Sequence, residues 1–397
     1  MTHSAIHRAT WWAARSLAAA AVLAAASAGG SALGDSGLPN AHFKTYDTPY
    51  YILYTDQDPD MVREASVRMT CMGEAYTRRC MAFGGAIQRK FPFYMFKNAG
   101  DYYQFSGAGS SAGCYIFNRT GGRLLARSDP EIGDHVWHTV QHEGFHQFVH
   151  MVIGGEIPIA INEGLAEYFG HGIWTGDDLL CGAIPPERLW QVQVLIKANR
   201  MSAWQDFFPK TPLRWGDMGD YDEAWSIVQF LVHADDGKYQ KPFVGMIADM
   251  AKRTPWDKAF VKWLGRDIDG LEKHWRQWWT DLPPDPTRDL YDQATVETLT
   301  SFLARASMRG MKFETADAFF AAARDGRLIV DPKNANVWNW LPPSLLETAL
   351  KDSEKLGQWS VTATPPAIAV KRPDGKTFTG TYVLPRNARP KVMVTIK

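Results

Sequence analysis

The sequence predicts an α+β protein, and three observations support that class. Short aromatic and β-branched runs surround one long helical segment between residues 42 and 127, which indicates a small sheet with a helix. Helical periodicity then dominates from Asp134 to about Trp279. Residues 357–397 alternate between apolar and polar side chains, as β strands do. We therefore expect an N-terminal α+β sheet unit, a mainly helical half after it and a small C-terminal β appendage.

The N-terminal unit is delimited by changes of periodicity and by a glycine pair. A helix is expected over residues 60–83, because apolar positions recur at helical spacing until Gly84-Gly85 end it. Four runs rich in aromatic and β-branched residues predict strands around this helix: 42–54 (as a strand or a hairpin), 90–97, 114–117 and 123–127.

The helical half is expected to contain a succession of amphipathic helices. Their ranges, taken from the apolar periodicity, are 134–153, 158–169, 187–199, 221–235, 240–251 and 268–279. After Pro283-Pro284 the periodicity weakens, and residues 283–356 are predicted to form a linker with a helix near 293–308. In the β appendage, Asp374-Gly375 between two alternating runs predicts a hairpin turn.

Residues 1–28 are predicted to be a Sec-type signal peptide. Arg8 and Arg15 precede an apolar run that ends in Ala26-Ser27-Ala28, a small-x-small cleavage pattern. The apolar run is about ten residues long, whereas a membrane-spanning helix needs about 20. We therefore expect a secreted or periplasmic protein with no membrane span in its mature chain.

The charge balance argues against nucleic acid as a partner. Lys plus Arg and Asp plus Glu both total 43, so the formal net charge is zero. A chain without net charge has no global field that would gather a polyanion or an anionic membrane surface.

Four cysteines follow the signal segment, an even number that an oxidising compartment could pair: Cys71, Cys80, Cys114 and Cys181. A bond between Cys71 and Cys80 is not expected, because their separation on one helix is about 13 Å along the axis. Any disulfide would therefore reach Cys114 or Cys181. The alternative is four buried thiols, because unpaired cysteine packs well as a small hydrophobic residue.

A metal-binding motif lies in the segment 134–152. His142-Glu143-Gly144-Phe145-His146 matches H-E-x-x-H. Residues four apart share one face of a helix, so both imidazoles can reach a single ion. Glu143 projects beside them, where it can act as a base toward water at the metal. The motif predicts His142 and His146 as metal ligands and Glu143 as the catalytic base.

Other histidine pairs on the same helix have the same spacing. His135, His138 and His150 lie on one arc with His142 and His146, so spacing alone does not choose among the pairs. Only the pair at 142 and 146 has a carboxylate directly after its first histidine. The three remaining histidines are interpreted as solvent-facing or supporting polar residues.

A third ligand is expected from the next helix. Gly154-Gly155 end the first helix and Pro158 suits the first turn of another, which then carries Asn162-Glu163-Gly164-Leu165-Ala166-Glu167-Tyr168. A helical hairpin of this kind can bring Glu163 to the metal.

The combination of H-E-x-x-H with N-E-G-x-A-x-Y resembles the gluzincin metallopeptidases, and most closely the peptidase-MA-like domains of exported bacterial proteins. The resemblance implies a zincin-like metallopeptidase domain over residues 42–282, with Zn²⁺ held by His142, His146 and Glu163. It also implies that Glu167 holds a ligand histidine by its other ring nitrogen. The alternative for Glu167 is a solvated helix residue.

A tyrosine is the candidate for stabilising the oxyanion. Tyr221 opens a segment with an apolar run, similar to the gluzincin segment whose tyrosine donates to the tetrahedral intermediate. A tyrosine that only caps a helix is the alternative. Aminopeptidase-type gluzincins also carry an acid that binds the substrate's free amine, and this chain has no acid between Asp101 and Asp129. The resemblance therefore favours an endopeptidase acting on a peptide or protein substrate.

Two other functions remain open at the level of sequence. The domain could bind zinc without proteolysis, as an envelope binding or scaffold domain. It could also hydrolyse a cell-wall amide in place of a protein.

Overall fold

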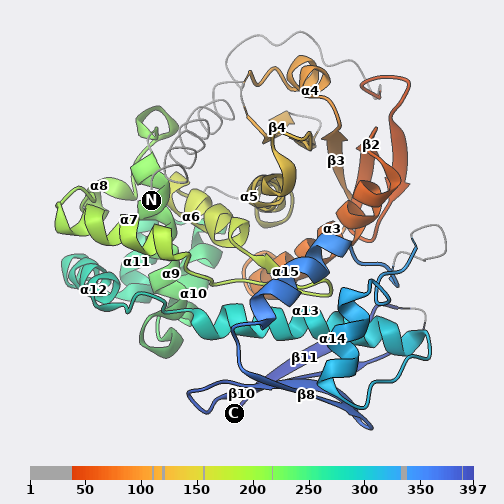
Figure 1. Cartoon of the computed structure of the whole chain (residues 1–397). Helices are drawn as coiled ribbons and strands as arrows, with labels where there is room; N and C mark the ends of the chain where they lie inside the picture. The colour runs from red at the N-terminus through yellow and green to blue at the C-terminus, as the bar shows by residue number, and fades with distance from the viewer. Residues whose placement is uncertain are drawn as a thin grey trace, which may run out of the picture. The chain divides into compact units, whose positions relative to one another are not determined.

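The computed structural model describes residues 38–109, 111–118, 121–154, 157–216, 218–331, 338–386 and 388–397, so the expected signal peptide lies outside the described residues. The chain is a mixed α+β protein with a small C-terminal β unit, as the sequence predicts (Figure 1). Its contacts divide it into two compact units. The first contains the segment ending at Gln57 together with Tyr76–Gly172 and Ile184–Pro286, and the second contains Asp58–Ala75, Ile173–Ala183 and Thr287–Lys397.

The first unit is built around a five-stranded sheet in the order β1-β2-β3-β5-β4. The strands are β1 (Lys44–Asp47), β2 (Tyr51–Thr55), β3 (Phe91–Phe96), β4 (Gly113–Asn118) and β5 (Gly121–Arg127). β2, β3 and β5 are parallel, whereas β1 and β4 are antiparallel to their neighbours. Every run predicted as a strand is confirmed, and the run 42–54 is the hairpin β1-β2.

Two helices lie between these strands in the sequence. α3 (Pro59–Cys80) confirms the predicted long helix, and it is shared by the two units, with the residues up to Ala75 in the second and those from Tyr76 in the first. α4 (Ala99–Ser106) was not expected, because it is short and its aromatic residues resemble those of a strand. Its signals are local: the side chain of Asn98 accepts hydrogen bonds from two backbone amides of the first turn, and Gly107 ends the helix at φ 70°.

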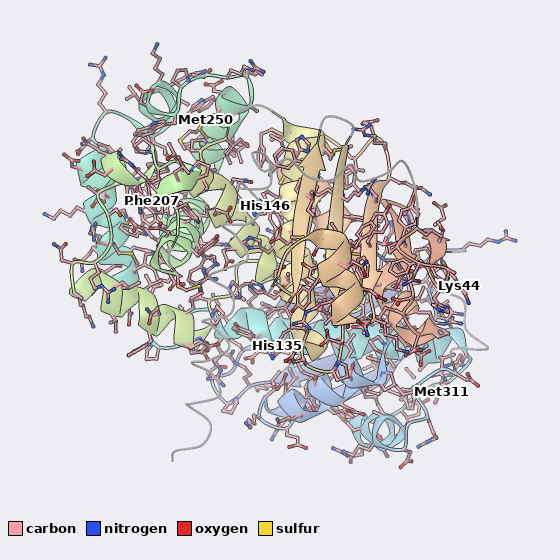
Figure 2. The ribbon with its side chains drawn as sticks, turned by 90° about the horizontal axis from the view of Figure 1, so that it is seen from above. Lys44, His135, His146, Phe207, Met250 and Met311 are labelled. Atoms are coloured by element: carbon pink, nitrogen blue, oxygen red, sulfur yellow. The ribbon has the colours of Figure 1, made fainter. Side chains whose placement is uncertain are left out.

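The remainder of the first unit is helical. Its helices are α5 (Val136–Phe148), which continues as a π-helical turn (Val149–Ile153), α6 (Ile159–Gly170), α7 (Pro186–Lys197), α8 (Trp204–Phe207), α9 (Met218–Gly237), α10 (Gln240–Ala251), α11 (Trp256–Leu264) and α12 (Ile268–Asp281). Each helix predicted here is confirmed, and the short α8 and α11 are additional. Buried indole rings pack against one another at tilted angles, Trp204 against Trp275 and Trp225 against Trp279. Figure 2 shows His146 between the strands and the helices that carry Phe207 and Met250.

The second unit combines helices with a four-stranded antiparallel sheet in the order β11-β10-β9-β8. Its elements are α13 (Arg288–Met308), α14 (Ala316–Arg324), α15 (Pro343–Ser353), β8 (Gln358–Ala363), β9 (Pro366–Lys371), β10 (Thr377–Val383) and β11 (Lys391–Ile396). Val296 of α13 packs against Val370 and Phe378 of the sheet. The hairpin predicted at Asp374-Gly375 is confirmed between β9 and β10. The segment expected as a linker thus contributes helices to the same unit as the strands.

A short hairpin between α6 and α7 also belongs to the second unit. It is formed by β6 (Ile173–Trp174) and β7 (Leu179–Leu180). In its turn, Asp177 accepts two hydrogen bonds from the guanidinium of Arg305, at 2.7 and 2.9 Å. Thr175 donates to Glu297 at 2.9 Å. Side chains of α13 therefore hold this hairpin through buried polar contacts.

The structure tests the expectations about disulfide bonds and about a membrane span. Cys71, Cys80, Cys114 and Cys181 are all buried, and none of them forms a disulfide bond. The alternative of four buried thiols therefore describes this structure. Among the described residues, no helix combines the length and the apolar character that crossing a bilayer requires.

Candidate metal centre

Helix α5 separates an apolar face from a face that carries histidines. Trp137, Val140, Phe145 and Phe148 are at most 3% exposed and lie in the core. Tyr76 of α3 contacts Phe145 and Phe148 through its ring. The apolar face therefore fixes the rotation of α5, and this rotation directs the H-E-x-x-H side chains toward α6.

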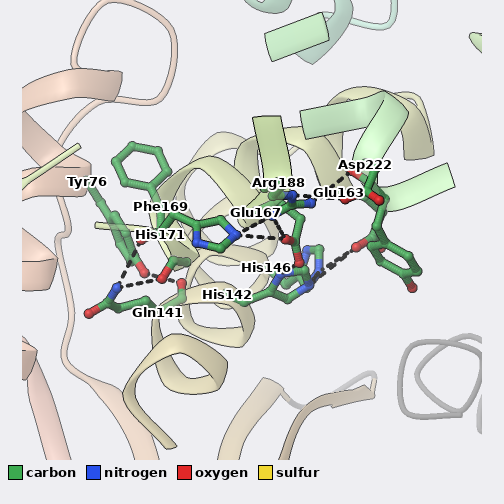
Figure 3. A network of polar contacts seen from close by, with 12 residues as sticks. Tyr76, Gln141, His142, His146, Glu163, Glu167, Phe169, His171, Arg188 and Asp222 are labelled. Carbon is green, nitrogen blue, oxygen red and sulfur yellow. Dashed lines mark hydrogen bonds and ion pairs between the residues drawn. The ribbon is translucent and has the colours of Figure 1, made fainter. Parts of the chain in front are cut away.

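The three predicted ligand atoms converge on one point. Nε2 of His142 and Nε2 of His146 lie 3.1 Å apart. Oε2 of Glu163 lies 3.3 Å from the first nitrogen and 3.4 Å from the second. The helical hairpin of α5 and α6 thus brings together the three residues that the sequence nominated, as Figure 3 shows. All three side chains are buried, with at most 9% exposed.

The geometry of this group suits a metal ion. Zinc ligands at about 2.0–2.1 Å in a tetrahedron are separated from one another by about 3.3–3.4 Å. The observed separations of 3.1, 3.3 and 3.4 Å lie close to that spacing. Moreover, Oε2 of Glu163 is buried and no described group donates a well-formed hydrogen bond to it. A buried carboxylate oxygen of this kind is a natural ligand for a cation.

The charges around the group also favour a cation. Burial lowers the pKa of the His142 imidazole, but Glu163 and Glu167 outweigh this effect and raise the pKa to about 10. Burial raises the pKa of Glu163, but His146 and His142 outweigh it and lower the pKa to about 2. Positive charge near the carboxylates therefore stabilises this group. A divalent metal ion can supply that charge while both imidazoles are neutral.

Two contacts hold α5 and α6 in register. The amide of Gln141 donates to the carbonyl oxygens of Phe169 and Gly170, at 3.1 and 2.9 Å, and thereby caps the C-terminal end of α6 (Figure 3). The hydroxyl of Tyr76 donates to the backbone carbonyl of Gln141 at 2.5 Å. These groups support the hairpin without relying on a metal.

Gly164 explains how α6 approaches α9. A Cβ atom at this position would lie 2.4 Å from the carbonyl oxygen of Ala224 and 2.7 Å from a methyl group of Val228. Only glycine permits this close crossing. The crossing brings the start of α9, with Tyr221 and Asp222, to the side of α6 that carries Glu163.

Glu167 lies beside His142. Its Oε1 is 2.9 Å from Nδ1 of His142, so it can accept the proton on the ring nitrogen that does not face the centre. Its Oε2 accepts a hydrogen bond from Arg188 at 2.5 Å. The side chain is buried, at 5% exposed, so the alternative of a solvated helix residue is wrong. Burial raises the pKa of Glu167, but Arg188 and then His142 outweigh it and lower the pKa well below its usual range.

Glu143 contacts the sheet as well as the histidines. The backbone N–H of Tyr115, in edge strand β4, donates to Oε2 of Glu143 at 2.9 Å. Burial raises the pKa of Glu143, and His142 and His146 only partly offset it. A carboxylate with a raised pKa is suited to accept and return a proton near neutral pH.

Tyr221 borders the same group. Its ring centroid lies 6.4 Å from that of His142, and Trp215 packs edge-on against it at 5.6 Å. Burial, and then the charge of Glu163, raise the pKa of the phenol, so it keeps its proton and remains a hydrogen-bond donor.

The other histidines of the segment 134–152 do not join the three ligands. His135 and His150 are exposed, and His150 pairs with the hydroxyl of Tyr115 at 2.5 Å. His138 packs against His171, with ring centroids 4.6 Å apart. His138, His171 and Glu167 form a second group whose ligand atoms lie within 4.8 Å of one another.

Sequence reasoning did not anticipate several residues that support the site: Gln141, His171, Arg188, Asp222 and the backbone of Tyr115. No local motif marks them, since each acts through a partner distant in sequence. The one available signal is Arg188, a charged residue near the start of a predicted helix with an apolar face.

Comparison with models of known protein families and with curated proteins finds no match to this chain.

Proposed function

We propose that this protein is a zinc-dependent peptide-bond hydrolase of the gluzincin type, with a zincin-like fold, that acts as an endopeptidase outside the cytoplasm. The observation that carries the proposal is the convergence of His142, His146 and Glu163 at zinc-ligand spacing. Glu143 follows the first of these ligands on the same helix. The pattern combines a metal site with an adjacent base, which is what hydrolysis of an amide requires.

The three ligands would hold Zn²⁺, which when bound lowers the pKa of water and polarises a carbonyl group. Glu143 accepts a proton from the attacking water and delivers it to the leaving amine. Tyr221 donates a hydrogen bond to the oxygen that gains negative charge. Glu167 fixes the orientation of His142 through Nδ1.

Edge strand β4 suits an extended peptide as substrate. The carbonyl of Ala112 accepts from the N–H of Arg127 in β5, so Cys114 and Ile116 also direct their backbone groups toward β5. The groups of Gly113, Tyr115 and Phe117 point the other way, where none of the described strands pairs with β4. A substrate strand added at this edge would lie beside Glu143, because the N–H of Tyr115 reaches that carboxylate.

The proposal is tested by metal analysis of the purified protein together with an unbiased peptide-cleavage profile. We expect one zinc per chain and cleavage within peptides, with no requirement for a free amine near the cut. Stoichiometric zinc without cleavage of any peptide or denatured protein would support a binding or scaffold domain in its place. Turnover of peptidoglycan but not of casein would move the chemistry to a cell-wall amide.

A further inference from the structure

Arg188 is a buried cation at the junction of three helices. It lies in the first turn of α7 and is only 3% exposed. Its Nε donates to Asp222 at 2.9 Å, and a terminal nitrogen donates to Glu167 at 2.5 Å. The other terminal nitrogen donates to the backbone carbonyl of Tyr221 at 3.3 Å. The guanidinium also stacks over the ring of Trp225, 4.3 Å from its centroid.

We propose that Arg188 is a positioning residue for the metal centre: it orients Glu167, and through Glu167 the ligand His142, relative to the helix that carries Tyr221. The inference rests on the proposed function and deepens it. The hydrogen bonds described for Arg188 reach neither the three ligand atoms nor Glu143, so its effect is indirect.

The two oxygens of Glu167 have separate partners. Oε1 faces Nδ1 of His142 at 2.9 Å, while Oε2 faces Arg188 at 2.5 Å. A carboxylate held at both ends cannot rotate without breaking one contact. Its orientation therefore fixes the tautomer of His142, with the proton on Nδ1 and the lone pair of Nε2 directed to the centre.

The planar guanidinium joins three elements in one geometry. It links Glu167 of α6 to the start of α9, where it holds Asp222 and the carbonyl of Tyr221. Five N–H groups in a rigid fork can satisfy these acceptors together, whereas the ammonium of lysine is a point charge on a flexible stem. The ligand helix and the helix of the oxyanion donor are thus tied to the same side chain.

Arg188 also determines what the second histidine group can bind. One terminal nitrogen contacts both Oε2 of Glu167 and Nε2 of His171. The guanidinium therefore sits where a cation bound by His138, His171 and Glu167 would sit. Two positive charges cannot share that position, so we expect a single metal ion per chain.

The test compares Arg188→Met and Arg188→Lys with the full-length wild-type protein. Zinc affinity is measured by competition with a chromophoric chelator, and the visible spectrum of the Co²⁺-loaded protein reports on ligand geometry. We expect Arg188→Met to lower zinc affinity by about 10- to 100-fold and to shift the Co²⁺ bands. Arg188→Lys keeps the positive charge but loses the planar guanidinium. We expect its zinc affinity to lie between those of the wild type and Arg188→Met, and its kcat to fall while KM stays nearly constant.

Arg305→Met is the matched control, because Arg305 is another buried arginine in a paired contact, with Asp177 of the second unit. It should lower the melting temperature of the metal-free protein as Arg188→Met does, but leave zinc affinity and the Co²⁺ spectrum unchanged. If Arg188→Met does not fold, Arg188→Lys carries the test.

Wild-type zinc affinity, Co²⁺ bands and kcat in a folded Arg188→Lys or Arg188→Met protein would overturn the inference. A wild-type protein that binds zinc but cleaves no peptide would instead overturn the proposed function. In that case the affinity and spectral readouts still decide the role of Arg188.

Discussion

The backbone N–H of Tyr115 donates to Oε2 of Glu143 at 2.9 Å, so the open edge of the sheet and the candidate base are in direct contact. A strand edge positions a peptide through its main chain, and a base acts on a proton at the bond to be cut. Because the two groups are in contact, a peptide bound along β4 would lie next to the carboxylate of Glu143.

Replacing Glu143 by glutamine tests the base. The amide has the same size and can still accept the hydrogen bond of Tyr115, but it cannot take a proton. We expect zinc content to be retained and kcat/KM to fall by about 10²-fold or more, as loss of general-base catalysis predicts. Glu131→Gln is the control, because this carboxylate is 80% exposed. An active Glu143→Gln enzyme would contradict the assignment.

Single alanine substitutions show which of the two histidine groups binds the metal. His142→Ala should abolish stoichiometric zinc, because it removes one of three ligands. His138→Ala should leave one zinc per chain, since His138 belongs to the group around Arg188. Metal analysis of the folded variants gives the result directly. Loss of zinc from His138→Ala would show that the metal lies in the second group.

Tyr221 lies inside α9, which begins at Met218, so the alternative of a helix cap is wrong. Tyr221→Phe distinguishes an oxyanion donor from a hydroxyl that only supports packing. Removing the hydroxyl should lower kcat by about 10²- to 10³-fold, while KM and zinc content stay near their wild-type values. Steady-state kinetics and a melting curve are sufficient. If the hydroxyl of Tyr221 only supports packing, the melting temperature changes and kcat does not.

Gly164→Ala should destabilise the first unit. The added methyl group would meet the carbonyl oxygen of Ala224 at 2.4 Å, and backbone atoms on both helices cannot move independently. We expect a loss of about 1–3 kcal/mol in the free energy of unfolding, measured by denaturant titration. Gly109→Ala is the control, because an added Cβ there meets nothing within 4 Å. Equal stability of the two variants would argue against the close crossing of α6 and α9.

Glu297 predicts a pH dependence of stability. Burial raises its pKa from 4.5 to about 7 in the folded protein, where it accepts a hydrogen bond from Thr175. The folded state therefore keeps a proton that the unfolded state releases, so the stabilisation present below pH 4.5 is lost as the pH rises to about 7. Glu297→Gln should remove this loss and raise the free energy of unfolding at pH 8 by about 3 kcal/mol, with little change at pH 4.

The control for this prediction is Glu314→Gln, at an exposed position. Unfolding is followed at both pH values for all three proteins. An equal effect of the two substitutions at pH 8 would show that the burial of Glu297 does not set the dependence.

The sequence predicts most of the regular structure because its apolar residues follow the periods of helices and strands. The ranges of α5, α6 and α9 follow from periodicity, and Gly154 ends the π-helical turn that precedes the second helix of the ligand hairpin. α4 and α11 are too short for their period to be distinguished from that of a strand or a loop. Their positions depend on packing against residues far away in the chain.

The residues of the candidate site also fall into those that the sequence could predict and those that it could not. His142 and His146 could be predicted because residues four apart share one face of a helix. Glu163 could be predicted from the expected helical hairpin and from the N-E-G-x-A segment, which resembles that of gluzincins. Arg188 and Gln141 could not, because their partners are Glu167, Asp222 and the end of α6, and no spacing rule connects them. Polar contacts between distant segments are specified by the folded structure as a whole.

The hairpin between α6 and α7 belongs to the second unit, so that unit is assembled from three separate stretches of chain. Asp177 in this hairpin pairs with Arg305, which lies beyond Pro286, the last residue of the first unit. During synthesis, the stretch that joins the two site-bearing helices emerges well before its partner does. The second unit therefore cannot complete its folding until residues well beyond the first unit have been synthesised. A chain that ended at Pro286 would lack Arg305, and the carboxylate of Asp177 would lose this partner.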